Sequence, residues 1–200
     1  ADLQAGRSLI AALMARGFDV YLIDWGYPGG ADRLLGLDDY VNRYIDACVE
    51  HLRQLLARDA LSVLGICQGG TLSTCYAALH PHKVERLITT VTPIDFHTPQ
   101  DMLSHFVRHI DVDSLLKSCG NVNGDFLNAL FLSLKPYRLI QQKYLRFLEQ
   151  LGDAEAVATF LRMEQWIFDS PALAARACGE FARDFYQANK LVKGEVDRKS

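Results

Sequence analysis

Residues 60–82 form a segment without Asp, Glu, Lys or Arg, and its hydrophobic pattern changes halfway along. Residues 61–66 are a short apolar run typical of a buried strand, whereas residues 71–79 are a largely apolar run of helical length. The glycine-rich stretch Gly65-Ile66-Cys67-Gln68-Gly69-Gly70 joins the two. Pro81 and these glycines argue against a membrane helix. The segment therefore predicts a buried strand, a sharp turn and a buried helix.

Strand-like runs alternate with helical patterns through the first half of the chain. The expected strands are residues 18–23, 61–66 and 86–91. The expected helices are residues 3–14, 37–56 and 71–79. In residues 37–56 the apolar side chains recur every three or four positions, as one face of a helix requires. Strands that alternate with helices form parallel crossover units, so we expect an α/β fold with a partial parallel sheet.

The second half of the chain predicts helices and no further convincing strand. Residues 102–110 and 137–148 carry apolar side chains at helical spacing. Ser170-Pro171 is typical of the start of a helix, here one that carries Phe181 and Phe185. We therefore expect a helical cap inserted into an α/β core. The expected domains are a core portion over 1–95, the cap over 96–195 and a return toward further core structure over 196–200.

Composition and charge exclude several classes of protein. The 200 residues are 50% hydrophobic and carry a net charge of −3, so the chain forms a core and has no basic surplus for nucleic acid. Its 5 cysteines include no CxxC pair, which predicts reduced thiols in the cytoplasm. The first residues lack the pattern of a signal peptide. We expect a cytoplasmic protein that neither spans a membrane nor binds nucleic acid.

Cys67 occupies the position of a nucleophile in the predicted turn. A strand, a tight glycine-flanked turn and a helix make up the nucleophile elbow of α/β-hydrolase enzymes, in which Gly65, Gly69 and Gly70 allow the close approach of strand and helix. The backbone N–H of Gln68 then faces the oxyanion, and the helix N-terminus favours a thiolate. The alternative is a structural cysteine in a glycine-rich turn. A phosphate-binding loop is excluded because Thr71 stands where that motif needs Lys.

A cysteine nucleophile needs a base, usually a histidine oriented by a carboxylate. Asp95 follows the third expected strand and is a candidate acid. His97, His105 and His109 come after it, but they fit the surface or the packing of the cap better, and no His follows a late strand. The catalytic Asp and His are therefore not matched in this chain. His80, His82 and Cys75 lack the further ligands of a metal site, so we expect neither a metal nor a resident cofactor.

Several segments in this order resemble the catalytic subunit of polyhydroxyalkanoate synthases, of the short type that works with a second subunit (class III or the related class IV). The resemblance covers essentially the whole chain. It rests on residues 19–33, 37–46, 62–70, 78–84, 92–96, 131–136, 160–171 and 184–195, which include SVLGICQGG and FLRMEQWIFDSP.

This resemblance implies an α/β-hydrolase fold with a helical cap and the polymerisation of (R)-3-hydroxyacyl-CoA, chiefly 3-hydroxybutyryl-CoA, with release of CoA. Cys67 is then the nucleophile and acyl carrier, and coenzyme A enters only as part of the substrate. The implied partners are the growing polyester, a second synthase subunit and a second copy bound through the cap. The implied location is the cytoplasm, at the surface of polyester granules.

The chain also departs from the family pattern. The family has an Asp in a DHxxPP-like segment and a His in a GHxG-like segment, and neither segment occurs here. We therefore expect the middle portion of a longer catalytic domain, which by itself does not turn over. Two other functions stay open. One is a cysteine-dependent α/β-hydrolase, such as a thioesterase or a dienelactone-hydrolase-like enzyme, and the other is an inactive scaffold that binds a granule or a partner.

Overall fold

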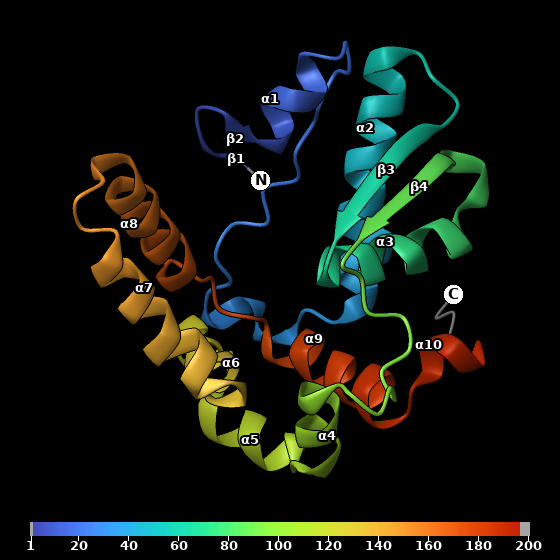
Figure 1. The fold of residues 1–200 in the computed structure, drawn as a ribbon. Helices are drawn as coiled ribbons and strands as arrows, with labels where there is room; N and C mark the ends of the chain where they lie inside the picture. Colours follow the sequence, from blue (N-terminus) through green and yellow to red (C-terminus); the bar gives the residue numbers. More distant parts are fainter. Residues whose placement is uncertain (1, 197–200) are drawn as a thin grey trace. The chain divides into compact units, whose positions relative to one another are not determined.

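In this computed structural model residues 2–196 are described, and they form two compact units (Figure 1). The smaller unit combines the residues up to Tyr27 with Asn123–Ala172, and the larger unit combines Pro28–Val122 with the residues from Leu173 onward. Neither unit begins or ends at residue 95. The expected boundaries of the core and the cap stay a prediction. Residues 197–200 of the expected return segment lie outside the described residues.

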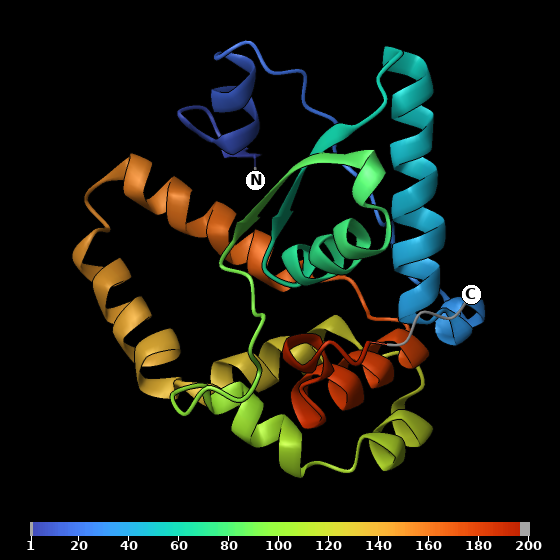
Figure 2. The same cartoon turned by 90° about the vertical axis from the view of Figure 1, so that its right-hand side faces the viewer.

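The larger unit contains a parallel pair of strands joined by a helix. Strand β3 (Leu61–Ile66) pairs with β4 (Val84–Thr90), in register from Ser62 opposite Arg86 to Ile66 opposite Thr90. Helix α3 (Gln68–Leu79) connects the two strands and packs on one face of the pair (Figure 2). A short 3-10 turn, η3 (Pro81–Lys83), leads into β4. The parallel α/β arrangement predicted from the alternating pattern is confirmed.

The long helix expected over residues 37–56 is also present. Its first part is a π-helical segment, η2 (Asp39–Ile45), and its second is α2 (Asp46–Leu56). The buried side chains lie at helical spacing, and they are Val41, Ile45 and Val49. The helix ends at Ala57, which adopts a left-handed conformation with φ of 50°. The apolar stripe in the sequence therefore marks the face that the helix buries.

A polar network holds α2 to the end of α3. Lys83 Nζ lies 2.7 Å from Asp46 Oδ1 and 2.7 Å from Glu50 Oε1. The hydroxyl of Tyr76, a fully buried residue, donates to Asp46 Oδ1 at 2.8 Å. Burial acts to raise the pKa of Asp46, but the hydrogen bonds from Lys83 and Tyr76 outweigh it and lower that pKa. Asp46 is therefore an ionised acceptor shared by two donors.

We expect Lys83→Met to lower the free energy of unfolding by about 1–2 kcal/mol near pH 7, because Asp46 loses a charged hydrogen-bond donor. The pKa of Asp46 is lowered in the folded state, so its contribution is present above about pH 4 and is lost as the pH falls through the lowered value. The pKa of Lys83 is raised, so its contribution is lost only as the pH rises through that raised value.

Urea unfolding at several pH values measures this effect. The deficit of Lys83→Met is expected to shrink as the pH falls below about 4, the ordinary pKa of an aspartate, and then through the lowered pKa of Asp46. Lys117→Met, which replaces an exposed lysine with no ion pair to a described residue, is the matched control and is expected to change stability little. A deficit that is constant from pH 7 to pH 3 would contradict the network.

The remainder of the larger unit is helical. Besides a short 3-10 turn, η1 (Gly30–Leu34), its elements are α4 (Met102–His109), α5 (Val112–Cys119), α9 (Ala175–Glu180), the π-helical η5 (Phe181–Gln187) and α10 (Lys190–Lys193). Phe96, Phe181 and Phe185 form a buried aromatic cluster, in which the Phe96 ring stacks on Phe185 at 5.7 Å. The cluster anchors the segment that follows β4 to η5.

The helix predicted to begin at Ser170-Pro171 begins instead at Ala175. Leu173 forms an antiparallel bridge with Val122, in which each backbone N–H donates to the other residue's carbonyl at 2.8–2.9 Å. A backbone engaged in this bridge is extended and does not continue a helix. The predicted start was therefore wrong, although the helical assignment of Phe181 and Phe185 was right.

The smaller unit consists of a short hairpin and several helices. Its elements are β1 (Asp2–Gln4), β2 (Arg7–Ser8), α1 (Leu9–Met14), α6 (Gly124–Leu134), the π-helical η4 (Tyr137–Gln142), α7 (Lys143–Glu149) and α8 (Ala154–Phe168). The hairpin takes up part of the helix predicted over residues 3–14. That helix starts only at Leu9, because the Ser8 side chain caps it by accepting from the Ala11 N–H.

The strand predicted over residues 18–23 is absent among the described residues. This segment has no regular secondary structure, and Phe18 and Leu22 are exposed by 60% and 73%. A strand requires a neighbour for its backbone hydrogen bonds, and in residues 2–196 no strand pairs with this segment. The prediction was therefore wrong, because β-rich composition cannot supply the pairing partner.

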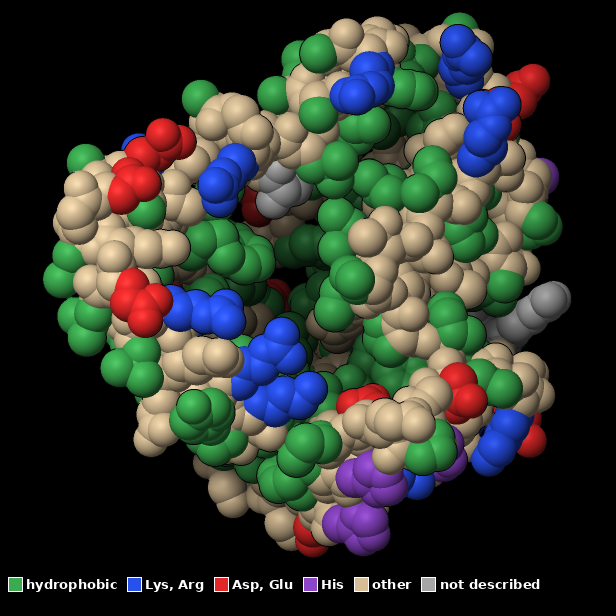
Figure 3. Space-filling model, viewed as in Figure 1, with side chains coloured by type: hydrophobic (Ala, Val, Ile, Leu, Met, Phe, Trp, Pro, Cys, Tyr) green, Lys and Arg blue, Asp and Glu red, His purple; other side chains and the backbone are tan. Residues whose placement is uncertain are grey.

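Large apolar side chains are exposed in both units. On the parallel pair these are Leu64, Ile66, Leu87 and Ile88. Figure 3 shows hydrophobic side chains over much of the face in view, with Lys and Arg side chains between them. Parallel strands usually carry apolar residues on both faces because both faces are covered. Within the described residues no helix is both long enough and apolar enough to cross a bilayer.

Candidate active site

Cys67 lies in the tight turn between β3 and α3, with φ of 53° and ψ of −125°. Positive φ is uncommon for a residue with a Cβ atom and is often maintained at functional sites. The Cys67 N–H donates to the Thr90 carbonyl at 3.0 Å, and its own carbonyl accepts from the Gly70 N–H at 2.9 Å. The side chain is exposed. This is the backbone conformation that a nucleophile elbow requires.

Two of the three turn glycines are needed for space. A Cβ on Gly65 would lie 2.5 Å from the Gly70 Cα and 2.7 Å from the Gly69 carbonyl oxygen. A Cβ on Gly70 would overlap the Thr92 side chain. A Cβ on Gly69 would meet nothing within 4 Å. Close contact of β3 with α3 therefore depends on Gly65, and close contact of α3 with Thr92 beyond β4 depends on Gly70, whereas Gly69 has open space.

Gln68 is the first residue of α3. The N–H groups in the first turn of a helix have no partner within that helix, and they point toward its positive end. The Gln68 N–H thus follows the nucleophile position directly and is available to an oxyanion formed there. One further donor completes a typical oxyanion hole, and sequence analysis assigns none in this chain.

The other cysteines differ from Cys67 in their surroundings. Burial raises the pKa of the Cys75 thiol to about 11 and that of the Cys178 thiol to about 11. Cys48 is half-buried, and Cys119 is exposed at the end of α5. Because the thiolate is the reactive form, Cys75 and Cys178 are unreactive near neutral pH. Cys67 is therefore the exposed thiol that also occupies a strained turn.

We expect iodoacetamide at pH 7.5 to modify Cys67 and Cys119 of the folded protein while Cys75 and Cys178 stay unmodified. Exposure and thiolate population both limit the rate of alkylation. Both are low for the buried Cys75, and the raised pKa keeps the thiolate population of the half-buried Cys178 low. Peptide mass spectrometry after timed quenching measures each site. Urea-unfolded protein, in which all cysteines react, is the control. Alkylation of Cys75 as fast as Cys67 in the folded protein would contradict this burial.

Asp95 does not orient a histidine ring among the described residues. Its Oδ1 accepts from the His97 backbone N–H at 2.9 Å and from Asn189 Nδ2 at 2.9 Å. The hydrogen bond from the His97 backbone, followed by that from Asn189, lowers the pKa of Asp95. The His97 ring instead contacts the Tyr186 carbonyl through Nε2 at 2.9 Å. Asp95 therefore closes a turn beyond β4 and joins it to Asn189.

Four further histidines have local partners. His105 contacts the Pro99 carbonyl and Arg108, and His109 contacts the His105 carbonyl. His80 Nε2 lies 2.9 Å from Asn42 Oδ1, and its ring lies beside that of His82. Among residues 2–196, no group of three or more His, Cys, Asp or Glu side chains is arranged to hold a metal ion. The described residues therefore bring no histidine to Asp95 as a base.

Sequence analysis missed Asn189 and Tyr186. Asn189 is 7% exposed, and it adopts a left-handed conformation with φ of 51°. Its Oδ1 accepts from the Phe96 N–H at 3.0 Å while its Nδ2 donates to Asp95. Asn tolerates this conformation better than most residues, but the sequence alone gave no sign that residue 189 contacts residues 95 and 96. Their separation along the chain hides the contact.

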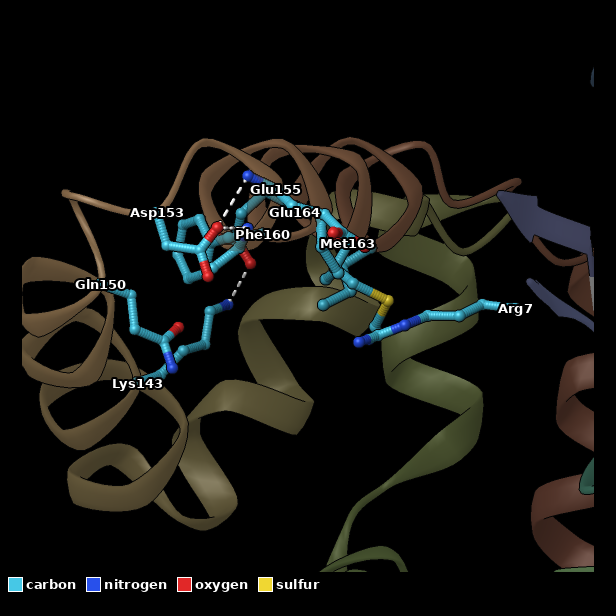
Figure 4. A pocket seen from close by; sticks show the side chains of 11 residues that line it. Arg7, Lys143, Gln150, Asp153, Glu155, Phe160, Met163 and Glu164 are labelled. Atoms are coloured by element: carbon cyan, nitrogen blue, oxygen red, sulfur yellow. Dashed lines mark hydrogen bonds and ion pairs between the residues drawn. The ribbon is translucent and has the colours of Figure 1, made fainter. Parts of the chain in front are cut away.

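The smaller unit has an open hollow of about 600 Å³ whose lining includes Arg7, Lys143, Asp153, Phe160 and Glu164 (Figure 4). Lys143 Nζ lies 2.5 Å from Glu164 Oε1. Glu164 also accepts from the Tyr144 hydroxyl at 2.7 Å. Asp153 accepts from the N–H groups of Glu155 and Ala156 at the start of α8. The carboxylates of Asp153 and Glu164 thus have protein partners, and the lining includes no thiol or histidine.

The fold and the strained turn define the class of protein. A family model described as the alpha/beta hydrolase fold matches residues 1–193. The chain therefore belongs to the α/β-hydrolase fold family. The α/β-hydrolase fold expected from the sequence is confirmed.

More specific similarity is found to proteins named poly(3-hydroxyalkanoate) polymerase subunit PhaC. The chain is 52% identical to that of Allochromatium vinosum, over 98% of this chain and 55% of the relative. It is 48% identical to that of Synechocystis sp., over 98% and 53%, and 39% identical to that of Haloferax mediterranei, over 98% and 40%. The resemblance to polyhydroxyalkanoate synthases is confirmed. The chain spans about half the length of the Allochromatium vinosum and Synechocystis relatives.

Proposed function

We propose that this chain is the nucleophile-bearing part of an acyltransferase that polymerises (R)-3-hydroxyacyl-CoA, chiefly 3-hydroxybutyryl-CoA, into polyester. The observation that carries the proposal is the exposed Cys67 side chain in the strained turn between β3 and α3. The similarity to proteins named poly(3-hydroxyalkanoate) polymerase supports the choice of substrate. The family implies that the catalytic Asp and His belong to segments that do not occur in this chain.

The proposed first step is a thioester exchange. The Cys67 thiolate attacks the carbonyl carbon of the acyl-CoA, and the carbonyl oxygen becomes an oxyanion that accepts a hydrogen bond from the Gln68 N–H. The oxyanion then collapses, the bond to the CoA sulfur breaks, and CoA leaves as a thiolate that takes up a proton. The new bond is again a thioester of similar energy. The acyl group on Cys67 therefore remains activated.

The proposed second step transfers this acyl group to a hydroxyl. The hydroxyl oxygen at the end of a growing chain attacks the Cys67 thioester, loses its proton to a base, and expels the Cys67 thiolate. An ester forms and the polymer grows by one unit. We assign no base to this step, because Asp95 and the ring of His97 have other partners. Thioester exchange keeps the acyl group activated, and ester formation then uses that activation. Neither step calls for a metal or a resident cofactor, so none is part of the proposal.

The other proposed properties follow from the family. The partners are a growing polyester chain, a second synthase subunit, and a second copy of the chain bound through the cap. The location is the cytoplasm, at the surface of polyester granules. The Allochromatium vinosum relative is named a polymerase subunit, which supports a multi-subunit assembly for that protein. We extend that assembly to this chain as part of the proposal.

The test uses radiolabelled 3-hydroxybutyryl-CoA. The chain alone and the chain extended with the flanking segments of its longer relatives are each incubated with the substrate, and CoA release and protein-bound label are measured. We expect the extended protein to release CoA and accumulate label, and Cys67→Ala to abolish both. Cys119→Ala, which removes the other exposed thiol, is the matched control and retains both.

Three results would contradict the proposal. Release of free hydroxy acid without bound oligomer would indicate a cysteine-dependent hydrolase instead. Full activity of Cys67→Ala would remove Cys67 from the mechanism. Absence of any Cys67-dependent reaction in the extended protein would indicate an inactive scaffold. The chain alone is expected to show no turnover.

A further inference from the structure

The hairpin of β1 and β2 contributes Arg7 to the hollow of the smaller unit, and Gln4 holds this hairpin against α8. Gln4 Nε2 donates to Thr159 Oγ1 at 3.1 Å, and Gln4 Oε1 accepts from Arg162 at 2.8 Å. Arg7 is the residue that pairs with Gln4 across the hairpin. Paired residues carry their side chains on the same face of two strands. Arg7 therefore extends over α8, and Figure 4 shows its side chain reaching toward Met163.

One face of α8 forms the apolar part of the lining. Its half-buried side chains recur every three or four residues, and they are Ala156, Phe160, Met163 and Ile167. This face is about 16 Å long at the rise of an α-helix. The Phe160 ring stacks on Phe147 of α7 at 4.0 Å, which holds α7 beside α8. The hollow of about 600 Å³ lies within the range of small-molecule sites, roughly 300–1,000 Å³. It therefore offers an elongated apolar surface to a carbon chain.

Arg7 supplies the hollow with a cation that has no protein partner. Lys143, the other cation of the lining, is paired with Glu164 at 2.5 Å. By contrast, no hydrogen bond or ion pair joins the Arg7 guanidinium to any of the residues that the structure describes. A guanidinium binds a carboxylate through two parallel hydrogen bonds. Arg7 is therefore available to a carboxylate bound in the hollow.

The opposite end of the hollow is acidic. Glu155 precedes Met163 by about 12 Å along α8, and its carboxylate has no partner within residues 2–196. A ligand carboxylate is repelled at this end and attracted at the end near Arg7. Between the two ends, the Gln150 side chain lines the hollow with an amide N–H group that can donate to a carbonyl oxygen. The charges therefore set the direction in which an anionic chain binds.

We infer that this hollow binds the free carboxylate end of a short linear oligomer of 3-hydroxyacyl units, with the carboxylate on Arg7 and the carbon chain along α8. The choice of an oligoester rests on the proposed function. Ester carbonyls accept hydrogen bonds, so they suit the Gln150 amide better than a plain alkyl chain does. In the proposed second step the polymer grows at its hydroxyl end. Binding of the carboxylate end therefore leaves the growing end free to react.

The test measures binding of the linear trimer of 3-hydroxybutyrate by isothermal titration calorimetry. The extended protein carries Cys67→Ala, so that binding is not mixed with a reaction. We expect Arg7→Gln to weaken binding of the trimer about tenfold, as the loss of a charged hydrogen-bonded pair implies. The methyl ester of the trimer, which lacks the carboxylate, is expected to bind equally weakly with or without Arg7. Arg7→Lys keeps the positive charge and is expected to recover part of the affinity.

Two controls separate the carboxylate site from general attraction. Arg138→Gln, at an exposed arginine of the same unit that does not line the hollow, is expected to leave trimer binding within about twofold. Dodecanoate has a carboxylate and a carbon chain but no ester, and it is expected to bind more weakly than the trimer. Dodecanoate binding as tight as that of the trimer would overturn the choice of an oligoester.

The outcomes also separate this inference from the proposed function. Absence of trimer binding, equal affinity for the trimer and its methyl ester, or unchanged affinity in Arg7→Gln would overturn this inference alone, because the proposed function rests on Cys67. Absence of Cys67-dependent CoA release would overturn the proposed function instead, and it is measured with a different substrate and a different variant.

Discussion

Replacing Gly65 with alanine is expected to lower the free energy of unfolding by about 2–4 kcal/mol and to reduce the alkylation of Cys67 in the folded protein. The added Cβ would lie 2.5 Å from the Gly70 Cα and 2.7 Å from the Gly69 carbonyl oxygen. Both are backbone atoms, so no side-chain rotation relieves the overlap. Strand β3 and helix α3 must separate, and the turn that holds Cys67 at φ of 53° then relaxes.

Gly69→Ala is the matched control for this prediction. It adds the same methyl group at another glycine of the same strand-turn-helix segment, where nothing lies within 4 Å of the added Cβ. Gly69 is inside α3, so alanine is expected to be neutral or to stabilise the helix by up to about 1 kcal/mol. Urea unfolding measures the free energy of unfolding. Timed alkylation with peptide mass spectrometry measures how fast Cys67 in the turn reacts in the folded protein. Equal stability of Gly65→Ala and Gly69→Ala would contradict the close contact.

Asn189→Ala is expected to lower the free energy of unfolding by about 2–4 kcal/mol. The variant loses the hydrogen bonds to Phe96 and Asp95, and it leaves the N–H of the buried Phe96 without a partner. It also places alanine at φ of 51°, a conformation that favours Asn or Gly. The segment between β4 and η5 loses these hydrogen bonds, so the contact of the His97 ring with the Tyr186 carbonyl is expected to loosen as well.

Asn189→Gly separates the two causes. Glycine accepts the left-handed conformation without strain but supplies no side-chain hydrogen bond. We expect Asn189→Gly to be more stable than Asn189→Ala by about 1 kcal/mol and still less stable than wild type. Urea unfolding and amide hydrogen exchange at Phe96 measure these differences. Wild-type protection of the Phe96 N–H in either variant would contradict its hydrogen bond to Asn189.

Features that depend on local sequence were predicted correctly. The regular spacing of apolar residues predicted the strand at residues 61–66, the helix after it and the long helix over residues 37–56. The glycines between residues 65 and 70 marked the turn between the first two. The strained turn at Cys67 was predicted in the same way, because tight strand-turn-helix geometry needs small residues at specific positions. In each case the signal in the sequence lies within a few residues along the chain, although β3 also needs its partner β4 for its backbone hydrogen bonds.

Features that depend on distant partners were decided by the tertiary structure. Residues 18–23 have strand-forming composition but pair with no strand among the described residues, and the bridge between Val122 and Leu173 moves a helix start to Ala175. The contacts of Asn189 with residues 95 and 96, and the contact of the His97 ring with the Tyr186 carbonyl, also join distant segments. The regular spacing of apolar residues shows which face of a helix or strand is apolar. It does not show which distant backbone group will complete a hydrogen bond.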